Sequence, residues 1–310
     1  MTNNKIKVFA PATIANVTCG FDILGFPLDG VGDEVIVRTM NEPGVKIVAI
    51  HGAEGLPLDP NKNVSGKVAL EMLKEAKSDL GIEMELVKGI HPGSGMGSSA
   101  SSSAGAAFAV NELLGQPFNE KDLVRFAMEG ERVASGVPHA DNVAPAVMGG
   151  FTLVRSYDPL DLIKLSTPAD LWCTVIHPQL QLKTEMSRNL LRKQIPLKTA
   201  VQQWGNVAGL VAGLYKEDYD LIGRSLIDVV AEPSRSILIP GFKELKEAAI
   251  QAGGLGGGIA GSGPSVYILS KGEETARKVE KAFEEVYTPT GIKFNIYVSR
   301  LASTGARIIE

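Results

Sequence analysis

The chain contains the stretch His91-Pro92-Gly93-Ser94-Gly95-Met96-Gly97-Ser98-Ser99-Ala100-Ser101, in which three alternating glycines lead into small residues. The small and apolar residues that continue to Val110 predict a helix, with Gly115 as its stop. Glycine lets a backbone turn sharply and approach a ligand closely, and a helix N-terminus presents unpaired N–H groups and partial positive charge. Residues 91–101 therefore predict a phosphate-binding loop rather than a Gly/Ser linker.

The hydroxyls of Ser98 and Ser99 stand at the expected helix entry, where they can cap the helix or reach a metal held by phosphates. The loop is not of the Walker A type, which needs a lysine directly before its last Ser or Thr. No lysine lies between Lys88 and Lys121.

Composition indicates a globular enzyme of one large or two medium domains. The 310 residues are 44% hydrophobic and 21% charged, with a formal net charge of −4. This acidic balance argues against a nucleic-acid surface, and no apolar run approaches the length of a membrane span. The two cysteines, Cys19 and Cys173, are far apart, as is usual in a reducing compartment. We expect a cytoplasmic protein without nucleic-acid or membrane partners.

Three further polar clusters each have a structural and a functional interpretation. Asn16 and Asp22 fall in a small-residue stretch, Pro11 to Gly25, that reads as a loop in which they can be turn formers or ligands. Glu129 and Glu131 flank the apolar stripe of a helix that Asn119 begins and Gly136 ends, and periodicity alone does not separate a solvated carboxylate from a ligand. His139, Asp141 and Asn142 can form either a capped turn or a metal site, although one His and one carboxylate are few ligands for zinc.

A second glycine-rich stretch, Gly253 to Ser265, contains a literal G-x-G-x-x-G at Gly256–Gly261. In a dinucleotide-binding fold this fingerprint follows a strand and opens a helix. Here a predicted helix, 242–252, precedes it and a predicted strand, 266–269, follows, so we reject that interpretation.

The loop from Pro92 to Ala100 resembles the phosphate-binding motif of the GHMP kinases. Pro11–Gly25 and Gly136–Gly150 resemble two further motifs of that family, in the form found in its homoserine-phosphorylating branch, and Gly253–Ser265 resembles the third glycine-rich motif. Two positions depart from the pattern, because Thr18 stands where Gly is usual and Ala140 where Pro is usual. Mevalonate-type members carry Asp where this chain has Asn142.

The resemblance implies an α+β fold of two domains around a central cleft. Residues 1–160 would form an ATP-binding domain like the second domain of ribosomal protein S5, and residues 161–310 a ferredoxin-like domain. The implied reaction is phosphorylation of the side-chain hydroxyl of L-homoserine by ATP with Mg²⁺, in threonine biosynthesis. Another small-alcohol kinase of the mevalonate type is the nearest alternative. A nucleic-acid-binding module and a non-catalytic nucleotide sensor are more distant ones. Whether the protein forms a homodimer stays open.

The resemblance also assigns roles to residues. ATP would bind the stretch His91–Ser101. The family's magnesium carboxylate falls eight residues before the His of the next motif, which selects Glu131, with the Ser99 hydroxyl as second ligand. Asn142 would orient the substrate hydroxyl, with no side chain as obligatory general base. The substrate residues would be Asn16, Asp22, His139, Asp141, Thr184, Arg188 and Arg235, with the arginines on the carboxylate and Asp22 or Asp141 on the ammonium.

Overall fold

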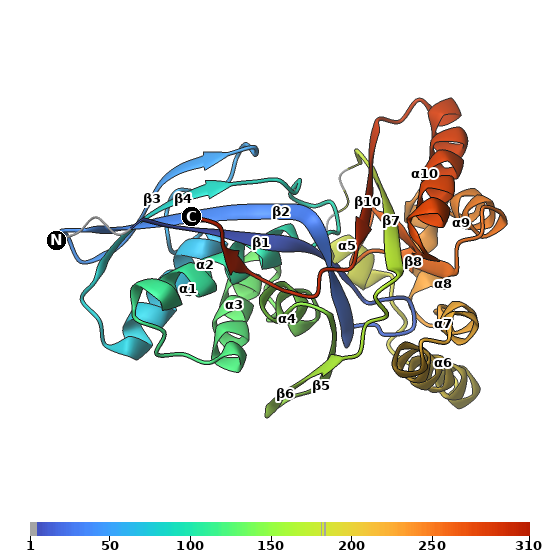
Figure 1. Ribbon diagram of the computed structural model, residues 1–310, viewed down its shortest axis with the longest axis horizontal. Coiled ribbons are helices and arrows are strands. Elements are labelled where there is room, and N and C mark those ends of the chain that lie inside the picture. Colours follow the sequence, from blue (N-terminus) through green and yellow to red (C-terminus); the bar gives the residue numbers. More distant parts are fainter. Residues whose placement is uncertain (1–4, 181, 183) are drawn as a thin grey trace.

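A computed structural model describes residues 5–180, 182 and 184–310, apart from the side chains at 184–186. The chain forms two sheets, each covered by helices (Figure 1). The first sheet has the order β11-β1-β2-β4-β3, and β5 pairs with the start of β2 and with β6. Its strands are β1 Lys5–Ala15, β2 Leu24–Met40, β3 Gly44–His51, β4 Gly81–Val87, β5 Phe151–Tyr157, β6 Leu160–Leu165 and β11 Arg307–Ile308.

Four helices lie on one face of this sheet, and α3 packs on α1, α2 and α4 (Figure 1). They are α1 Val64–Ala76, α2 Ser98–Leu113, α3 Glu120–Ser135 and α4 Ala140–Met148. The small side chains of α2 let it lie close to β1 and β2, since a Cβ on Gly105 would meet Val35 Cγ2 at 2.7 Å. Close packing on all sides explains why a helix with little amphipathic pattern is buried along most of its length.

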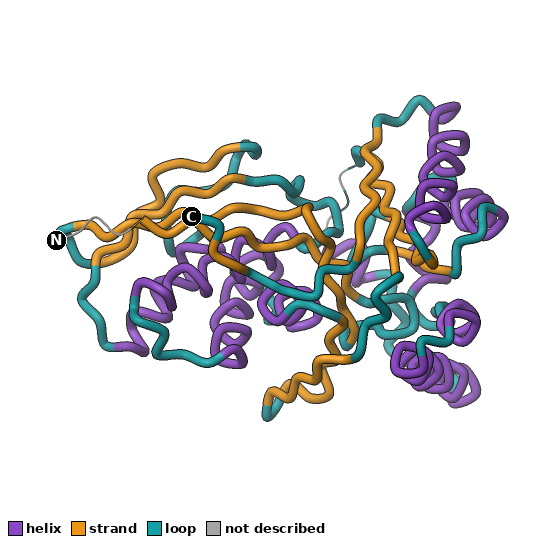
Figure 2. Tube along the Cα trace, viewed as in Figure 1, coloured by secondary structure: helices purple, strands orange, loops and turns teal. Residues whose placement is uncertain are grey.

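The second sheet has the order β10-β7-β9-β8. Its strands are β7 Leu171–Pro178, β8 Gly256–Ile259, β9 Val266–Lys271 and β10 Phe294–Arg300. The helices of this half are α5 Thr184–Asn189, α6 Leu197–Lys216, α7 Tyr219–Ser225, α8 Glu232–Arg235, α9 Phe242–Gln251 and α10 Glu273–Tyr287. Figure 2 shows the strands of each half meeting near the middle of the molecule.

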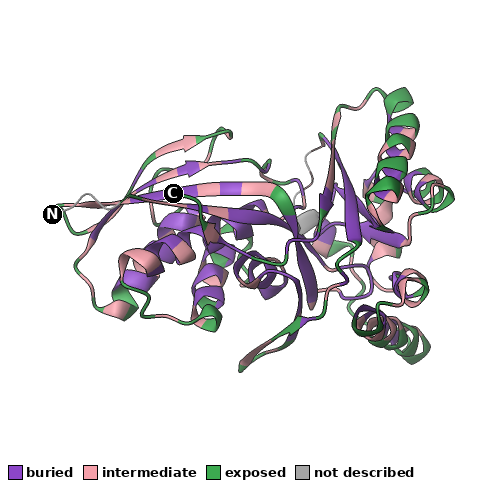
Figure 3. Cartoon of the chain, viewed as in Figure 1, coloured by how far each residue is buried: buried purple, intermediate pink, exposed green. Residues whose placement is uncertain are grey.

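One apolar cluster joins the two halves. Ile14 and Phe26, at the inner ends of β1 and β2, pack in the same buried cluster as Val175 of β7 and Tyr267 of β9. The continuous buried colour in Figure 3 follows these strands into the second sheet. The expected division at residue 160 stays a prediction: it falls in the β5–β6 hairpin, and β11 returns to the first sheet.

Several local predictions are confirmed. Asn119 caps α3 through a capping box with Asp122, and Gly136 ends the helix at φ +78°. The sequence also predicts a strand at Phe151–Tyr157 and a helix at Glu273–Tyr287, and β5 and α10 have these bounds. In the described part of the chain, no helix is long and apolar enough to span a membrane.

Three predictions about local structure are wrong. Pro11–Ala15 continues β1 rather than forming a loop, because a register shift between Pro11 and Thr13 accommodates the proline. The sequence pattern predicts a helix over 219–230, but α7 ends at Ser225. Beyond it, Asp228 accepts hydrogen bonds from the N–H groups of Val230, Ala231 and Glu232, which replace helical ones. The resemblance to the third motif implies a glycine-rich turn in the second glycine stretch, but Gly256–Ile259 forms the strand β8, paired with β9.

Candidate active site

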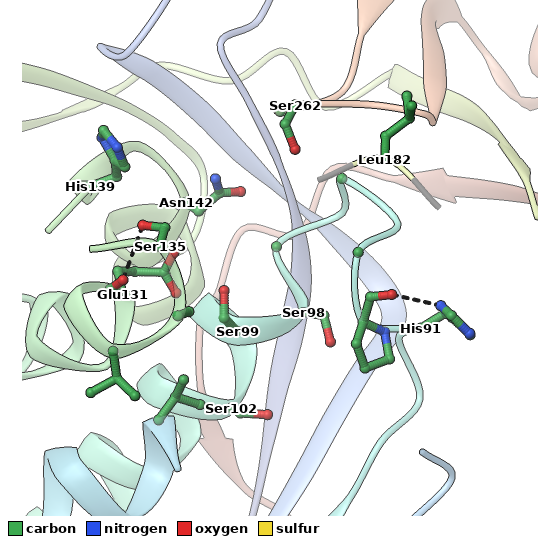
Figure 4. A pocket seen from close by; sticks show the side chains of 18 of the residues that line it. His91, Ser98, Ser99, Ser102, Glu131, Ser135, His139, Asn142, Leu182 and Ser262 are labelled. Carbon is green, nitrogen blue, oxygen red and sulfur yellow. Dashed lines mark hydrogen bonds between the residues drawn. The ribbon is translucent and has the colours of Figure 1, made fainter. Parts of the chain in front are cut away.

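A cavity of about 740 Å³ lies where the glycine loop, α3, α4, α5 and the loop after β1 meet (Figure 4). Most of the residues predicted for the site line it, although they are far apart in the sequence. They are Asn16, Asp22, His91, Pro92, Gly93, Gly95, Gly97, Ser98, Ser99, Glu131, His139, Asp141, Asn142, Arg188 and Arg235.

Four residues of the predicted ATP-binding stretch are instead buried in the protein: Ser94, Met96, Ala100 and Ser101. The carbonyl of Ser94 accepts the hydroxyl of Ser265 at 2.7 Å, and the Ser101 hydroxyl donates to Ala10 O at 2.6 Å. These contacts hold the loop against the second glycine stretch and β1. Thr184 begins α5, and its side chain lies outside the described residues.

The glycines of the loop are required by backbone geometry. Gly93, Gly95 and Gly97 all have positive φ values, of +78°, +84° and +66°. A Cβ on Gly95 would lie 2.5 Å from Ala260 O, and one on Gly97 would lie 2.0 Å from Thr13 Oγ1. The loop can therefore approach both the second glycine stretch and β1 only without side chains at these positions.

Gly97, rather than a serine, is the N-cap of α2, and it makes no side-chain cap. The Ser98 hydroxyl donates to Ile90 O at 3.0 Å, so the expectation that Ser98 caps the helix is wrong. The N-terminus of α2 thus begins at the cavity without a side-chain acceptor of its own, which suits an anionic ligand.

A buried ion pair beneath the loop was missed at the sequence level. Lys88 Nζ pairs with the Asp33 carboxylate and also donates to Ser98 O at 2.8 Å and to Ser102 Oγ at 2.7 Å. The other oxygen of Asp33 accepts the N–H groups of Gly89 and Ile90. Burial lowers the pKa of Lys88, and the Asp33 charge opposes that shift. The pair fixes the start of the glycine loop to the first turn of α2.

Glu131 is buried at the cavity on α3, beside Ser99 of α2 (Figure 4). Burial raises the pKa of its carboxyl to about 7, although a hydrogen bond with Ser99 and the charge of Lys88 act in the opposite direction. Its Oε1 has no hydrogen-bond partner among the described residues. Glu129, by contrast, pairs with Arg132 at 3.1 Å on the outer side of the helix.

The oxygen atoms of Glu131 and Ser99 are suitable ligands for a hard cation. A buried carboxylate oxygen without a partner and an adjacent hydroxyl are ligands that Mg²⁺ accepts, while phosphate and water complete its shell. In the described part of the chain, no group of three or more His, Cys, Asp or Glu side chains could hold a metal.

Arg188, Asp22 and His139 form a polar triad at one wall of the cavity. Arg188 Nη2 lies 2.9 Å from Asp22 Oδ1 and 3.4 Å from Nδ1 of His139. Because arginine only donates, Nδ1 must be the acceptor and the proton of a neutral His139 sits on Nε2. Burial, followed by the Arg188 charge, lowers the pKa of His139, so the ring is neutral at pH 7.

Asp141 is a second buried acid at this wall, on the first turn of α4. Burial, with the negative charges of Asp22 and Glu131 nearby, raises the pKa of its carboxyl to about 7. An ammonium group entering the cavity would relieve this repulsion, because it would neutralise the carboxylates.

Arg235 is a cation without a carboxylate partner in the described part of the chain, although it is only 4% exposed. Its Nε donates to Ser187 O at 3.1 Å and its Nη1 to Gly261 O at 3.4 Å. Its guanidinium lies 4.9 Å from the ring centroid of Phe21, a lining residue that the sequence did not single out. Burial lowers the pKa of Arg235, so an anionic ligand would be favoured beside it.

Asn16 bridges the two loops instead of facing solvent. Its Nδ2 donates to Gly261 O at 2.7 Å, and its Oδ1 accepts the Asp22 N–H at 3.0 Å. Asn16, Val17 and Thr18 all have positive φ, of which Thr18 occupies the position that is usually Gly in the motif. Asn16 therefore positions Asp22 as well as lining the cavity.

Asn142 lies on α4, facing the glycine loop (Figure 4). Its Oδ1 accepts the hydroxyl of Thr13 at 2.8 Å, and Thr13 is fully buried in β1. An amide oxygen has two lone pairs, so Asn142 can still accept or donate one hydrogen bond toward the cavity.

Comparison with known proteins defines the class. Residues 63–150 match the N-terminal domain of the GHMP kinases and residues 210–288 match their C-terminal domain, so the chain has the two-domain α+β fold of the GHMP kinases. Leishmania mevalonate kinase in complex with R-mevalonate shares this fold at a TM-score of 0.71 and 16% identity, over 97% of each chain.

Within this class, the chain belongs to the homoserine kinase family. Homoserine kinase of Chlorobium phaeobacteroides is 52% identical over 98% of this chain and 99% of that protein. The Xylella fastidiosa homoserine kinase is 38% identical over 99% of this chain and 95% of that one. A crystal structure of homoserine kinase from Cytophaga hutchinsonii covers 100% of this chain and 98% of that one, with a TM-score of 0.97 and 51% identity.

Proposed function

We propose that this protein transfers the γ-phosphoryl group of ATP to the side-chain hydroxyl of L-homoserine, a step of threonine biosynthesis in the cytoplasm. Beyond family membership, one observation supports this substrate. The same cavity holds a buried arginine, Arg235, that has no carboxylate partner among the described residues, and two carboxylates, Asp22 and Asp141. A zwitterionic amino acid offers a carboxylate to the former and an ammonium to the latter.

Arg188 takes part in substrate binding by exchanging the Asp22 carboxylate for the carboxylate of the substrate. In the structure, its guanidinium pairs with Asp22 at 2.9 Å. A bound amino acid would place its carboxylate between Arg188 and Arg235 and its ammonium near Asp22 and Asp141. Four charges that now repel or pair internally would then be matched with the ligand, which gives binding energy to that end of the substrate.

The nucleotide phosphates would lie along Gly93, Gly95 and Gly97 at the N-terminus of α2. Glu131 and the Ser99 hydroxyl would hold a Mg²⁺ ion, and Ser99 is favoured over Ser98 because it lies beside Glu131. Such an ion neutralises charge on the transferring phosphoryl group. Lys88 lies beneath the glycine loop and supports it, because its hydrogen bonds keep Ser98 and Ser102 in place.

Asn142 would orient the homoserine hydroxyl, and Thr13 would fix the amide for that task. A loose phosphoryl-transfer transition state needs little activation of the attacking oxygen. No side chain is therefore assigned as an obligatory base, and the proton leaves late to phosphate or water. His139 is neutral and already accepts from Arg188, so it serves substrate binding rather than proton removal.

Release of ADP, measured with a panel of small alcohols, tests the proposal. We expect turnover with L-homoserine and little with mevalonate, which lacks the ammonium group that Asp22 and Asp141 would bind. Arg277→Leu on the exposed side of α10 serves as a control for loss of one arginine. Faster turnover of mevalonate than of homoserine would overturn the substrate assignment.

A further inference from the structure

Gln203 is a buried amide on α6 that joins the two segments carrying charged groups proposed for the substrate. Its Nε2 donates to Cys19 O at 2.9 Å and to Oδ1 of Asp228 at 3.0 Å, and its Oε1 accepts the Val229 N–H at 3.0 Å. The side chain is only 8% exposed, and it does not line the cavity. Gln203 therefore connects two segments of the site without being placed to touch a ligand.

One of these segments is the loop between β1 and β2, which carries Asp22. Figure 1 shows this loop, in blue, reaching the second half of the protein beside α6 and α7. Residues 16–18 have φ values of +69°, +31° and +52°, a conformation that is strained in residues other than glycine and persists only where neighbouring groups hold it. The hydrogen bond from Gln203 to Cys19 O is one such support, placed between residues 16–18 and Asp22.

The other segment runs from Asp228 into α8, which carries Arg235. The Asp228 carboxylate accepts the N–H groups of residues 230–232 at 2.8 to 3.0 Å, so it fixes the backbone at the start of α8. The Arg235 guanidinium then lies 4.9 Å from the ring centroid of Phe21, which belongs to the loop between β1 and β2. Arg235 and the carboxylate next to Phe21 in the sequence are thus carried by two segments that a single amide ties together.

The amide of Gln203 can make this connection in one orientation only. Its two N–H groups face acceptors, Cys19 O and the Asp228 carboxylate, while its oxygen faces the Val229 N–H. A flipped amide would place its oxygen against two acceptors and its N–H groups against a donor. The three partners therefore require a side chain of this length that donates twice and accepts once, which neither methionine nor ionised glutamate does.

We propose that Gln203 is a positioning residue that sets the separation between Arg235 and Asp22, and through it the preference for a ligand with both a carboxylate and an ammonium group. This inference rests on the proposed function, which assigns Arg235 and Asp22 to the two charged ends of homoserine. A ligand with both ends must satisfy the two groups at once, whereas a ligand with one charged end can follow whichever group moves. Loss of the Gln203 hydrogen bonds therefore weakens the first kind of ligand more than the second.

Gln203→Met tests this inference, because methionine keeps the length of the side chain and loses the hydrogen bonds. The KM for L-homoserine should rise at least about fivefold, while the KM for ATP changes less than about twofold. Two competitors of homoserine complete the test: 4-hydroxybutyrate lacks the ammonium group, and 3-aminopropan-1-ol lacks the carboxylate. Their inhibition constants should change less than about twofold. Gln202→Met, at the exposed neighbouring residue, is the matched control and should change none of these values.

Gln203→Glu should raise the KM for homoserine further than Gln203→Met, because its carboxylate would face Cys19 O and the Asp228 carboxylate. KM and inhibition constants do not depend on the fraction of the protein that is folded, so lost stability cannot imitate the expected pattern. An equal rise for homoserine and both competitors would overturn the inference, and so would a homoserine KM that both variants leave unchanged. A wild type that does not phosphorylate homoserine would instead overturn the proposed function on which the inference rests.

Discussion

The hydroxyl of Thr13 donates a 2.8 Å hydrogen bond to Oδ1 of Asn142, and this contact joins the first strand to the helix that carries the proposed orienting amide. It lies directly beside Gly97 of the phosphate loop, where a Cβ would be 2.0 Å from the Thr13 oxygen and 2.9 Å from the Asn142 oxygen. The orientation of the amide is thus set by a buried residue that need not touch the substrate.

Thr13→Val should therefore lower kcat through Asn142. The substitution keeps the shape of the side chain and removes one hydrogen bond, so we expect a loss of about tenfold, against about 10- to 100-fold for Asn142→Ala. The double variant should be no slower than Asn142→Ala alone, because Thr13 has nothing left to orient. Steady-state kinetics of the three variants would measure this, and additive losses would contradict it.

Arg235→Leu should raise the KM for homoserine by at least about tenfold, which corresponds to about 1.4 kcal/mol. The KM for ATP should change little, because Arg235 lies by Phe21 and Gly261 rather than at the glycine loop. Unaltered homoserine kinetics would remove Arg235 from the substrate site. Thermal melting of the variant must accompany the kinetics to detect a loss of stability, since Arg235 is buried and donates a hydrogen bond to Ser187 O.

Glu131→Gln should cut kcat steeply and shift the Mg²⁺ dependence to higher concentration, while the protein stays folded. The amide keeps the size of the side chain but loses the charge that a divalent cation requires. Glu129→Gln is the matched control on the same helix, because Glu129 pairs with Arg132 away from the cavity. The assignment is wrong if Glu129→Gln is the damaging change and Glu131→Gln is harmless.

Asp141→Asn should become more stable relative to the wild type as pH rises from about 5 to about 8. Burial raises the pKa of Asp141 to about 7 from an ordinary value of 3.8, so the folded state keeps a proton that the unfolded chain has lost. The stability that this proton brings is present at low pH and is lost as pH rises through about 7. Asparagine has no proton to lose.

Denaturant unfolding at several pH values measures that difference between variant and wild type. The comparison is needed because burial lowers the pKa values of His139 and His177, which changes the wild-type stability in the opposite direction at acidic pH. Asp79→Asn, at an exposed carboxylate, should show no such trend. A difference for Asp141→Asn that stays constant across this range would refute the prediction.

Features that rest on local signals could be predicted from the sequence. Backbone geometry that only glycine tolerates marks the glycine loop, capping side chains mark the ends of α3, and hydrophobic periodicity marks the bounds of β5 and α10. Glu131 was different. Its helix gave no reason to prefer it to Glu129, and only the resemblance of the neighbouring motif selected it. Its burial depends on α2, which packs on α3 from elsewhere in the chain.

Residues that position the site were missed because their partners are distant in sequence. Lys88 meets Asp33 from 55 residues away, and Thr13 meets Asn142 from 129 residues away. Read locally, Lys88 is a charge at a strand end and Thr13 a small residue in a strand. One usable signal was the change from the usual Pro to Ala140, which frees a backbone N–H at the start of α4.

That N–H has a partner. The Ala140 N–H donates to the Tyr157 oxygen at 3.3 Å, and the Tyr157 hydroxyl donates to the carbonyl of Asp22 at 2.9 Å. Tyr157 therefore ties the loop that carries Asp22 to the helix that carries Asp141, the two carboxylates proposed for the ammonium. Proline at position 140 would remove the first of these bonds, and phenylalanine at position 157 would remove both.

Tyr157→Phe should raise the KM for homoserine about 3- to 10-fold and leave the KM for ATP nearly unchanged, since one or two exchangeable hydrogen bonds are worth about 0.5–1.5 kcal/mol each. Ala140→Pro should have a smaller effect in the same direction. In Tyr157→Phe the Ala140 N–H has already lost its acceptor, so adding Ala140→Pro should cost little more. Independent, additive effects would show that Tyr157 does not work through Ala140. Equal changes in the KM values of both substrates would show that it supports the whole cleft rather than the ammonium site.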